Sequence, residues 1–434
     1  MQRGPLRFAA FVRIFAVITL FAINAAAVTE KVLYTFHGAG DGSLPSTNLI
    51  FDKAGNLYGT TSAGGSAACD NSYGIFGCGT VFELSPNSSG GWTETVLYSF
   101  QGGDDGINPG NIVFDKAGNI YGTTWGGGDQ TCFEGCGTVY KLSRSHGIWT
   151  ESVLYRFQGG SNGYAPVGVI LDAAGNVYGA TLSGGNSSCN YTNFGCGVLF
   201  ELSESGGVWT ETLLHTFGAT ATDGQNPNGG FVFDRQGNLY GSTQDGGTAS
   251  VNSGTIFKFT PSTGSESVLV SFAGGAPGGC LPTGGIIFGP SGRLYGAAYG
   301  GGLYDLGALF EAGLTSQGWG EAAIQSFGFG TETGQNPTGL ISTDSAGNLY
   351  GTTEYGGVAG IGWGTVYKVS PNSTNGWTGT LIYAFTGAAD GGIPLGGVVV
   401  DSKSNLYGTA RVGGLGTCDP YYGKGCGVVF EITP

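Results

Sequence analysis

The stretch Asp52–Thr61, DKAGNLYGTT, has the composition of a tight turn that leads into a β-strand. Aspartate can accept a backbone N–H across such a turn, and Gly and Asn tolerate the left-handed conformation that a tight reversal needs. The stretch returns almost unchanged at Asp115–Thr124 as DKAGNIYGTT. Its tyrosine occurs seven times, always followed by glycine and spaced 55 to 63 residues from the next: Tyr58, Tyr121, Tyr178, Tyr240, Tyr295, Tyr350 and Tyr407. Such recurrence indicates a repeat architecture.

Each repeat carries four segments of strand length, which we call strands A to D. In the first repeat, the apolar run NLIFD (strand A) precedes the turn, and the tyrosine segment is strand B. GTVFEL (strand C) follows a glycine-rich loop, and WTETVLYSF (strand D) comes last. Four strands in each of seven repeats predict an all-β fold, a seven-bladed β-propeller of four-stranded antiparallel blades. A β-solenoid is the alternative, but its coils are shorter and tolerate less variation in repeat length.

The two ends of the chain predict how the ring closes. The last repeat stops at its strand C, GVVFEITP, and has no strand D. Val28–Phe36, VTEKVLYTF, resembles a strand D that precedes the first strand A. We therefore expect this N-terminal strand to complete the last blade and to cover an edge that would otherwise stay unpaired. Residues 28–434 then form a single domain.

Composition and charge exclude several classes of protein. The 88 glycines among 434 residues far exceed the usual ~7%, but they follow no Gly-X-Y period, which excludes collagen. With 40% hydrophobic residues, the chain can bury a core and is not a disordered glycine tract. The net charge of −14 disfavours binding to nucleic acid or to an anionic membrane.

Residues 1–27 read as a signal peptide. Arg3, Arg7 and Arg13 precede the apolar run Phe15–Ile23, and Ala25–Ala27 offers a small-residue cleavage site. We expect cleavage near Ala27 and a monomeric protein that is secreted or kept in the cell envelope. An uncleaved, membrane-anchored form is the alternative. Loss of the three arginines would make the mature chain more acidic still.

The repeat resembles the GloVer tandem-repeat family of exported bacterial proteins. The resemblance rests on the pattern VLYSF-x-GG-x-DG, P, D-x-x-GNLYGTT, GG and GTVF, which covers nearly the whole mature chain. It implies export and a repeat fold but no particular activity. Members of the family often end in a cell-surface anchor. Because nothing follows Pro434 here, we expect release rather than covalent attachment.

The alternating strand directions place the D–A and B–C loops on one face and the A–B turns and C–D loops on the other, which we expect to be plain. Four B–C loops carry paired cysteines: Cys69/Cys78, Cys132/Cys136, Cys189/Cys196 and Cys418/Cys426. In an exported protein, close pairs like these predict disulfides. Metal binding is the alternative, but a structural zinc needs four ligands. Cys280 has no partner in this pattern and is either a buried thiol or an intermolecular bridge.

The first face also holds the candidate ligand contacts. Trp125 and Trp363 interrupt the repeat in its B–C loops, and Asp41, Asp105, Asp223 and Asp390 recur before glycine in its D–A loops. An aromatic ring among small polar residues suits stacking on a sugar or a protein contact, although loop packing explains it equally. The aspartates suit turn formation. Their functional alternative is contact with carbohydrate hydroxyls or Ca²⁺, but no loop is dense in acidic residues, so we expect no cofactor.

Two functions remain open. The first is a non-catalytic exported propeller that binds an extracellular polysaccharide or protein through the D–A/B–C face. The second is a secreted hydrolase or lyase that acts on a carbohydrate or lactone. The positions expected at the channel mouth, such as Thr47–Asn48 and Gly110–Asn111, offer no Asp, Glu, His, Lys or Cys. Acid–base catalysis normally needs a positioned pair of titratable groups, so we favour the first function and predict no catalytic residue.

Overall fold

The computed structural model describes residues 28–434, except 39, 67–68, 70–76, 186–188, 190–194, 249–252, 276–277, 290–291, 330–332, 358–361, 375 and 419–424. The predicted signal peptide, residues 1–27, lies outside the described residues. The described part is almost entirely β-structure, with one short 3-10 helix, η1 (Gly160–Asn162). None of the helices in the ranges described could span a membrane, because none is long and apolar enough.

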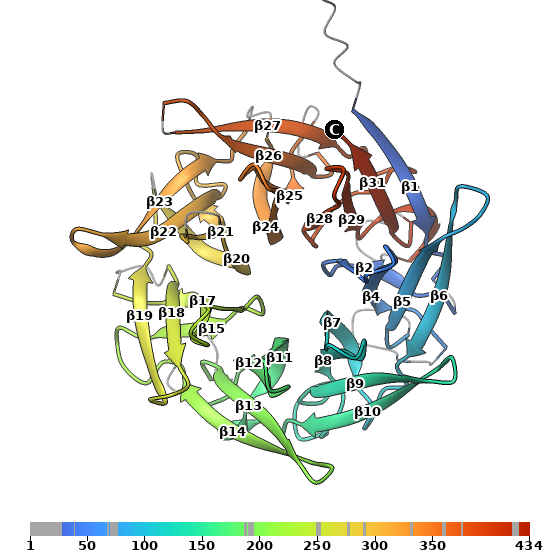
Figure 1. Cartoon of the computed structure of the whole chain (residues 1–434), viewed down its shortest axis with the longest axis horizontal. Helices are drawn as coiled ribbons and strands as arrows, with labels where there is room; N and C mark the ends of the chain where they lie inside the picture. The colour runs from blue at the N-terminus through green and yellow to red at the C-terminus, as the bar shows by residue number, and fades with distance from the viewer. Residues whose placement is uncertain are drawn as a thin grey trace, which may run out of the picture.

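Seven antiparallel sheets are arranged in a ring, and the strands of each sheet lie side by side in order from the centre to the rim (Figure 1). The prediction of a seven-bladed propeller is therefore confirmed. Strands A, nearest the centre, are β2 (Ser43–Pro45) with β3 (Ile50–Phe51), β7 (Ile107–Phe114), β11 (Tyr164–Leu171), β15 (Gly224–Pro227) with β16 (Val232–Phe233), β20 (Gly279–Phe288), β24 (Gln335–Thr343) and β28 (Val398–Val400). Strands B are β4 (Leu57–Ala63), β8 (Ile120–Gly126), β12 (Val177–Ser183), β17 (Leu239–Gly246), β21 (Leu294–Gly301), β25 (Leu349–Tyr355) and β29 (Leu406–Ala410).

The outer half of each blade is formed by strands C and D. Strands C are β5 (Thr80–Pro86), β9 (Thr138–Ser145), β13 (Val198–Ser205), β18 (Thr255–Thr260), β22 (Ala308–Thr315), β26 (Thr365–Pro371) and β31 (Val428–Thr433). Strands D are β6 (Trp92–Ser99), β10 (Ile148–Arg156), β14 (Val208–Thr216), β19 (Ser265–Ser271), β23 (Gly318–Ser326), β27 (Trp377–Ala384) and β1 (Thr29–Thr35). The remaining strand, β30 (Gly413–Thr417), lies in the loop between β29 and β31.

The ring closes as the sequence predicts. The N-terminal strand β1 pairs antiparallel with β31, from Thr29 opposite Thr433 to Thr35 opposite Val428. In Figure 1 these two strands lie side by side at the rim, one from each end of the chain. The edge of the seventh blade is thus covered by main-chain hydrogen bonds from the start of the domain.

The hydrophobic core is divided among the interfaces between neighbouring blades. One cluster, for example, joins Tyr58, Val81 and Phe100 of the first blade to Ile120 and Tyr140 of the second. Six further clusters join the other neighbouring pairs in the same way. Every blade therefore buries both of its faces, and no blade is expected to be stable without its neighbours.

The repeated Tyr-Gly and Thr positions follow from packing within each blade. Gly59 has no side chain because the ring of Phe82 from strand C covers it, and an added Cβ would lie 2.7 Å from that ring. Thr61 and Thr80 are both fully buried, and their hydroxyls lie 2.8 Å apart. This contact satisfies two polar atoms inside the blade, which explains why both threonines recur.

The strands A differ from the sequence prediction in where they begin. In six blades they begin before the proline that was assigned to the D–A loop, and four of them change register just after it. Thr47 and Asn48 lie between β2 and β3, the two segments of the first inner strand, and not where that strand begins. Near the axis, Asn48 Oδ1 accepts hydrogen bonds from the N–H groups of Leu340 and Gly397, at 3.3 and 2.6 Å. These residues hold the blades together.

Candidate functional site

Seven residues with the same unusual backbone conformation surround the axis on the D–A/B–C face. Each precedes the proline of a strand A and has a φ between 54° and 56°: Leu44, Asn108, Ala165, Asn226, Leu281, Asn336 and Ile393. In this left-handed conformation, the N–H group of each residue donates to a carbonyl of the preceding blade, at 2.7–3.1 Å. Such a conformation is costly for Leu and Ile and persists only where the surrounding structure fixes it. It therefore fixes the D–A loops against their neighbours.

A second ring of seven residues lies one residue beyond the buried part of each strand B. The five residues before it are buried in every blade, whereas this position is half-buried. We call this set the mouth ring: Ser62, Trp125, Leu182, Gln244, Tyr299, Glu354 and Arg411. Each member of the mouth ring is a different amino acid, although the positions before it repeat closely. Tyr299 and Glu354, from adjacent blades, are joined by a hydrogen bond of 3.0 Å from the phenol to the carboxylate.

Three members of the mouth ring line a hollow of about 380 Å³ that spans blades 7, 1 and 2. We call it the mouth hollow, and its polar and aromatic lining includes Ser46, Ser62, Asn108, Trp125, Glu134 and Arg411. The Trp125 ring is tilted against Tyr164, with 5.8 Å between the ring centroids. The hollow thus offers an aromatic face, a guanidinium, hydroxyls and an amide to a ligand on the axis.

The two candidate tryptophans have different positions. The sequence analysis placed Trp125 in a B–C loop, but this residue belongs to strand β8. Its side chain lines the mouth hollow. Trp363 occupies the position that the second cysteine has in the disulfide-bonded blades. Its ring packs against Gly387 and Gly392 of the following D–A loop. Trp363 therefore has a packing role, and a contact with a ligand stays a prediction for this residue.

The four candidate aspartates close the D–A loops. Asp105 Oδ2 accepts the N–H of Gln101 at 2.6 Å, and its Oδ1 accepts the hydroxyl of Tyr98, on strand D, at 3.0 Å. Asp41 and Asp390 make the same two contacts with Tyr34 and Tyr383 and with their own loops. These bonds bear out turn formation, while contact of the aspartates with a ligand stays a prediction.

Sequence reasoning missed the glutamates of strand D, each of which faces one of these aspartates across a blade interface. Burial, followed by the negative charge of Asp41, raises the pKa of Glu94 to about 7. Glu30 and Glu151 stand in the same relation to Asp390 and Asp105, and their pKa values are also raised to about 7, chiefly by burial. The signal was present in the repeated Trp-Thr-Glu at the start of strand D, where the glutamate returns in step with the tryptophan.

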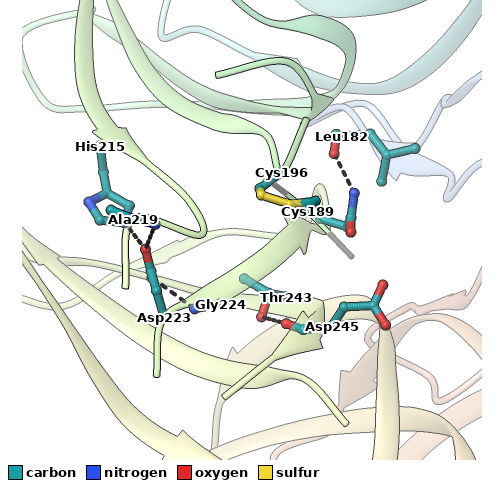
Figure 2. The surroundings of a disulfide bond; sticks show 10 residues. Leu182, Cys189, Cys196, His215, Ala219, Asp223, Gly224, Thr243 and Asp245 are labelled. Atoms are coloured by element: carbon teal, nitrogen blue, oxygen red, sulfur yellow. Dashed lines mark hydrogen bonds and ion pairs between the residues drawn. A yellow bond between two sulfur atoms is a disulfide. The ribbon is translucent and has the colours of Figure 1, made fainter. Parts of the chain in front are cut away.

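At the interface between the third and fourth blades, histidine replaces the tyrosine. His215 Nε2 lies 3.1 Å from Asp223 Oδ2, and Figure 2 shows the imidazole directed at this carboxylate. Ligand atoms of His215, Asp223 and Glu266 all lie within 4.8 Å of one another. Among the described residues, this is the one group of three His, Cys, Asp or Glu side chains that lie close enough together to hold a metal ion. It belongs to the rim and is separate from the mouth hollow.

The opposite face contains a larger hollow, of about 780 Å³, between the first two blades. The turns at Lys53 and Lys116 line it, together with Arg144, His146 and Trp149. The guanidinium carbon of Arg144 lies 5.8 Å from the centroid of the Trp149 ring. The sequence analysis expected the face of the A–B turns to be plain. The structure instead shows a recess between the turns of two blades, lined by both basic residues and the aspartates Asp52 and Asp115.

The predicted disulfides are confirmed in all four blades. Their Cα–Cα distances of 4.8–5.5 Å lie within the range that disulfides adopt: Cys69–Cys78, Cys132–Cys136, Cys189–Cys196 and Cys418–Cys426. Each packs against a glycine of the adjacent D–A loop, such as Gly102 beside the Cys69 sulfur. The bonds therefore brace the loops of blades 1, 2, 3 and 7, and Figure 2 shows the Cys189–Cys196 bond.

Both cysteines of each pair lie in a B–C loop, as the sequence predicts, but the second cysteine is also part of the core. These four side chains are at most 1% exposed and belong to the hydrophobic clusters between blades: Cys78, Cys136, Cys196 and Cys426. They are buried because the D–A loop of the next blade covers them. The carbonyl of Cys78, for example, accepts the N–H of Asn108 at 2.9 Å. These cysteines are therefore core residues that anchor the loops, and their side chains offer no surface to a ligand.

The ninth cysteine is not part of a disulfide. Cys280 is a half-buried thiol, and burial raises its pKa. The prediction of a thiol without a partner in the repeat is thus confirmed, whereas an intermolecular bridge stays a prediction.

Comparison with known proteins identifies the repeat and the fold. A family model described as the Gloeobacter/Verrucomicrobia repeat matches residues 69–287 and 250–434. No curated protein matches the sequence. Among solved structures, the extracellular domain of BT4673 from B. thetaiotaomicron, a proposed hybrid two-component system, has 11% identity and a TM-score of 0.53. That match covers 94% of this chain and 42% of the other, so this chain spans less than half of that domain.

A second structural match carries an enzyme's name. The XC5397 gluconolactonase from Xanthomonas campestris has 13% identity and a TM-score of 0.38, over 68% of this chain and 78% of the other. Likeness at these identities shows the propeller fold alone, because unrelated functions share it. The chemistry of this chain must therefore be argued from its own residues.

Proposed function

This chain belongs to the Gloeobacter/Verrucomicrobia repeat family, and from its mouth hollow we propose that it is an exported, non-catalytic propeller that binds an extracellular polysaccharide. The binding surface is the D–A/B–C face, with Trp125 as its aromatic contact. Asp41, Asp105, Asp223 and Asp390 hold the surrounding loops in place. The protein is monomeric in this proposal and needs no cofactor to bind sugar.

The observation that carries the proposal is the diversity of the mouth ring. Structural demands act equally on all seven blades, and they keep the neighbouring positions of strand B nearly identical. Ser62, Trp125 and Arg411 stand at equivalent positions around one hollow and have unrelated chemistry. Differences of this kind suit an asymmetric ligand, because each side chain then meets a different group. An indole beside hydroxyl and amide groups suits a sugar ring, which has an apolar face and polar edges.

Export is supported by the disulfides and by the structural neighbours. Local disulfides form and persist in oxidising compartments, and four of them are present here. The matched domain of BT4673 is extracellular. The N-terminal segment, with its three arginines and apolar run, has the form of a signal peptide.

The lining of the mouth hollow also bears on the alternative of a hydrolase or lyase. Hydrolysis of a glycoside commonly uses two carboxyl groups on either side of the scissile bond. Among the described residues that line the hollow, Glu134 supplies one carboxyl group. Glu354 of the mouth ring is already bonded to Tyr299. This arrangement favours binding over turnover.

A glycan array probed with the mature protein tests the proposal. We expect binding to a defined class of polysaccharide, and Trp125→Ala should weaken it at least about 10-fold, as for an aromatic residue at the centre of a binding site. Arg144→Ala, in the recess of the opposite face, is the matched control and should bind as the unaltered protein does. Release of reducing sugar or opening of a lactone by the mature protein would favour the enzyme instead. Loss of binding in the Arg144 variant alone would move the site to the opposite face.

A further inference from the structure

Three separate segments bring metal-ligating side chains together at the rim, between the third and fourth blades. His215 lies near the end of strand β14, Asp223 precedes strand β15, and Glu266 lies on strand β19 of the next blade. Asp223 is only 5% exposed and His215 is 18% exposed. The cluster is therefore largely shielded from water.

The loop holds the Asp223 carboxylate in a fixed position. Its Oδ2 accepts the N–H of Ala219 at 3.0 Å, and its Oδ1 accepts the N–H of Gly224 at 2.8 Å, as Figure 2 shows. The His215 ring is held edge-to-face against Phe217, with 4.9 Å between their centroids. Two of the three candidate ligands are thus oriented before any ion arrives, which lowers the entropic cost of binding.

The distances suit a tetrahedral ion. Zinc bonds to nitrogen and oxygen of about 2.0–2.2 Å place neighbouring ligand atoms about 3.3–3.6 Å apart. His215 Nε2 and Asp223 Oδ2 are 3.1 Å apart, and the ligand atoms of all three residues lie within 4.8 Å. A movement of about 1 Å by the flexible Glu266 side chain would complete the set. Glu266 Oε1 is buried and accepts no hydrogen bond, so one of its oxygens is available to an ion at this point.

The other interfaces serve as internal comparisons. At Asp41, Asp105 and Asp390 the residue corresponding to His215 is a tyrosine, whose hydroxyl donates to the aspartate. The facing glutamates there also have a buried oxygen without a partner. A neutral tyrosine, however, does not belong to the usual zinc ligands, which are Cys, His, Asp and Glu. His215 therefore gives this interface a usual zinc ligand at a position where the interfaces at Asp41, Asp105 and Asp390 have a tyrosine.

We propose that His215, Asp223 and Glu266 bind one zinc ion, which joins the third blade to the fourth. One imidazole and two carboxylates supply three ligands, and water supplies the fourth. A hydrogen bond between His215 and Asp223 without a metal accounts for two of the residues, and it leaves Glu266 Oε1 without a hydrogen-bond partner. This site is independent of the proposed sugar binding, because it lies at the rim and shares no residue with the mouth hollow.

Metal titration of the mature protein tests the proposal. Protein stripped with EDTA, dialysed and kept oxidised should bind one equivalent of ZnCl₂ in calorimetry, and CoCl₂ should give the visible absorption of a four-coordinate site. Zinc should also raise the melting temperature, since an ion that binds only the folded state stabilises it. His215→Tyr recreates the residue found at the sister interfaces, so it should fold normally. It should bind zinc at least about 100-fold more weakly, since even residues behind a ligand contribute 10–100-fold.

Two further variants separate this site from zinc bound elsewhere. Tyr98→His places an imidazole beside Asp105 and Glu151, and the number of zinc ions bound should rise from one to two. Cys280→Ser removes the unpaired thiol and should leave the affinity unchanged. Zinc binding that survives in His215→Tyr, or that disappears in Cys280→Ser, would overturn the assignment, as would the absence of any binding at equimolar zinc.

Discussion

The aspartate that opens the turn before strand B makes contacts that depend on both of its oxygens. Asp52 Oδ1 accepts the N–H groups of Ala54 and Asn56, at 2.8 and 2.9 Å. Its Oδ2 accepts the Asn56 amide at 2.8 Å and the Tyr58 hydroxyl at 3.3 Å. The bonds to the asparagine recur at five other turns: Asp115, Asp172, Asp234, Asp344 and Asp401. One side chain thus orders the turn and orients the next strand.

Replacing one of these aspartates should destabilise the protein measurably. Asp52→Ala removes the acceptor for four donors, one of which is the hydroxyl of the buried residue Tyr58. We expect a loss of about 2 kcal/mol in the free energy of unfolding, the usual scale for hydrogen bonds to a charged group. Urea unfolding followed by fluorescence gives this value. Asp104→Ala, at an exposed loop position, should change it by less than about 0.5 kcal/mol, and equal effects of the two variants would refute the role of the turn.

At the scale of the strand, the closure of the ring depends on β1. Removing residues 28–36 would expose the edge of β31 and would remove Phe36, which is fully buried against Phe82. We expect the truncated protein to aggregate or to unfold partly, because an unpaired edge beside an open core recruits other chains. Size-exclusion chromatography and thermal unfolding report this outcome. An added tag before Val28 is the control and should be neutral, whereas an unchanged melting temperature after the deletion would contradict the closure.

The sequence predicts the strands well where local signals repeat, as in strand B and its turn. It fails at strand A, since residues such as Leu44 and Ile393 adopt a left-handed conformation that neither prefers. Their conformation is imposed by a carbonyl of the preceding blade, which no local pattern reveals. The candidate binding site could likewise be predicted only in part, because most of its residues come together only in the folded ring. Trp125 stands out as a break in the repeat, whereas the mouth ring emerges only once the blades are placed around the axis.

The cysteines illustrate the same limit of sequence reasoning. Spacing along the chain was enough to pair them, because each pair is separated by only four to nine residues. Spacing could not show that one member of each pair enters the core, since the next blade is what buries Cys78, Cys136 and Cys426.

At the scale of the whole molecule, the interfaces between blades repeat a pair of acidic side chains near the rim. Glu30, Glu94 and Glu151 each face an aspartate of the preceding D–A loop. Ion pairs do little to neutralise this charge, because the described residues form a single Arg–carboxylate ion pair, between Arg293 and Glu311. The ring therefore brings together carboxyl groups that the unfolded chain keeps apart, and their protonation must be coupled to folding.

This coupling predicts a protein that is more stable in mild acid than at neutral pH. The pKa values of Glu30, Glu94 and Glu151 are raised to about 7 in the folded state, mainly by burial. A raised pKa means that the folded state holds the proton more tightly, so this stabilisation is complete below the ordinary pKa of 4.5 and is lost as the pH rises through about 7. The turn aspartates act in the opposite direction. Burial opposes their ionisation, but hydrogen bonds from Asn238 and Asn348 lower the pKa values of Asp234 and Asp344, so their contribution is lost in stronger acid.

Calorimetry should accordingly give a melting temperature that is highest near pH 5 and falls steadily towards pH 8. Glu94→Gln supplies the decisive comparison, because glutamine keeps the shape of the protonated glutamate and cannot ionise. Its melting temperature should match that of the unaltered protein near pH 5 and exceed it at pH 8, where Glu94 and Asp41 otherwise repel each other. Glu134→Gln, at the mouth hollow and away from these interfaces, should leave the pH dependence unchanged. A melting temperature that rises between pH 5 and pH 8 would show that the acidic pairs do not control the stability of the ring.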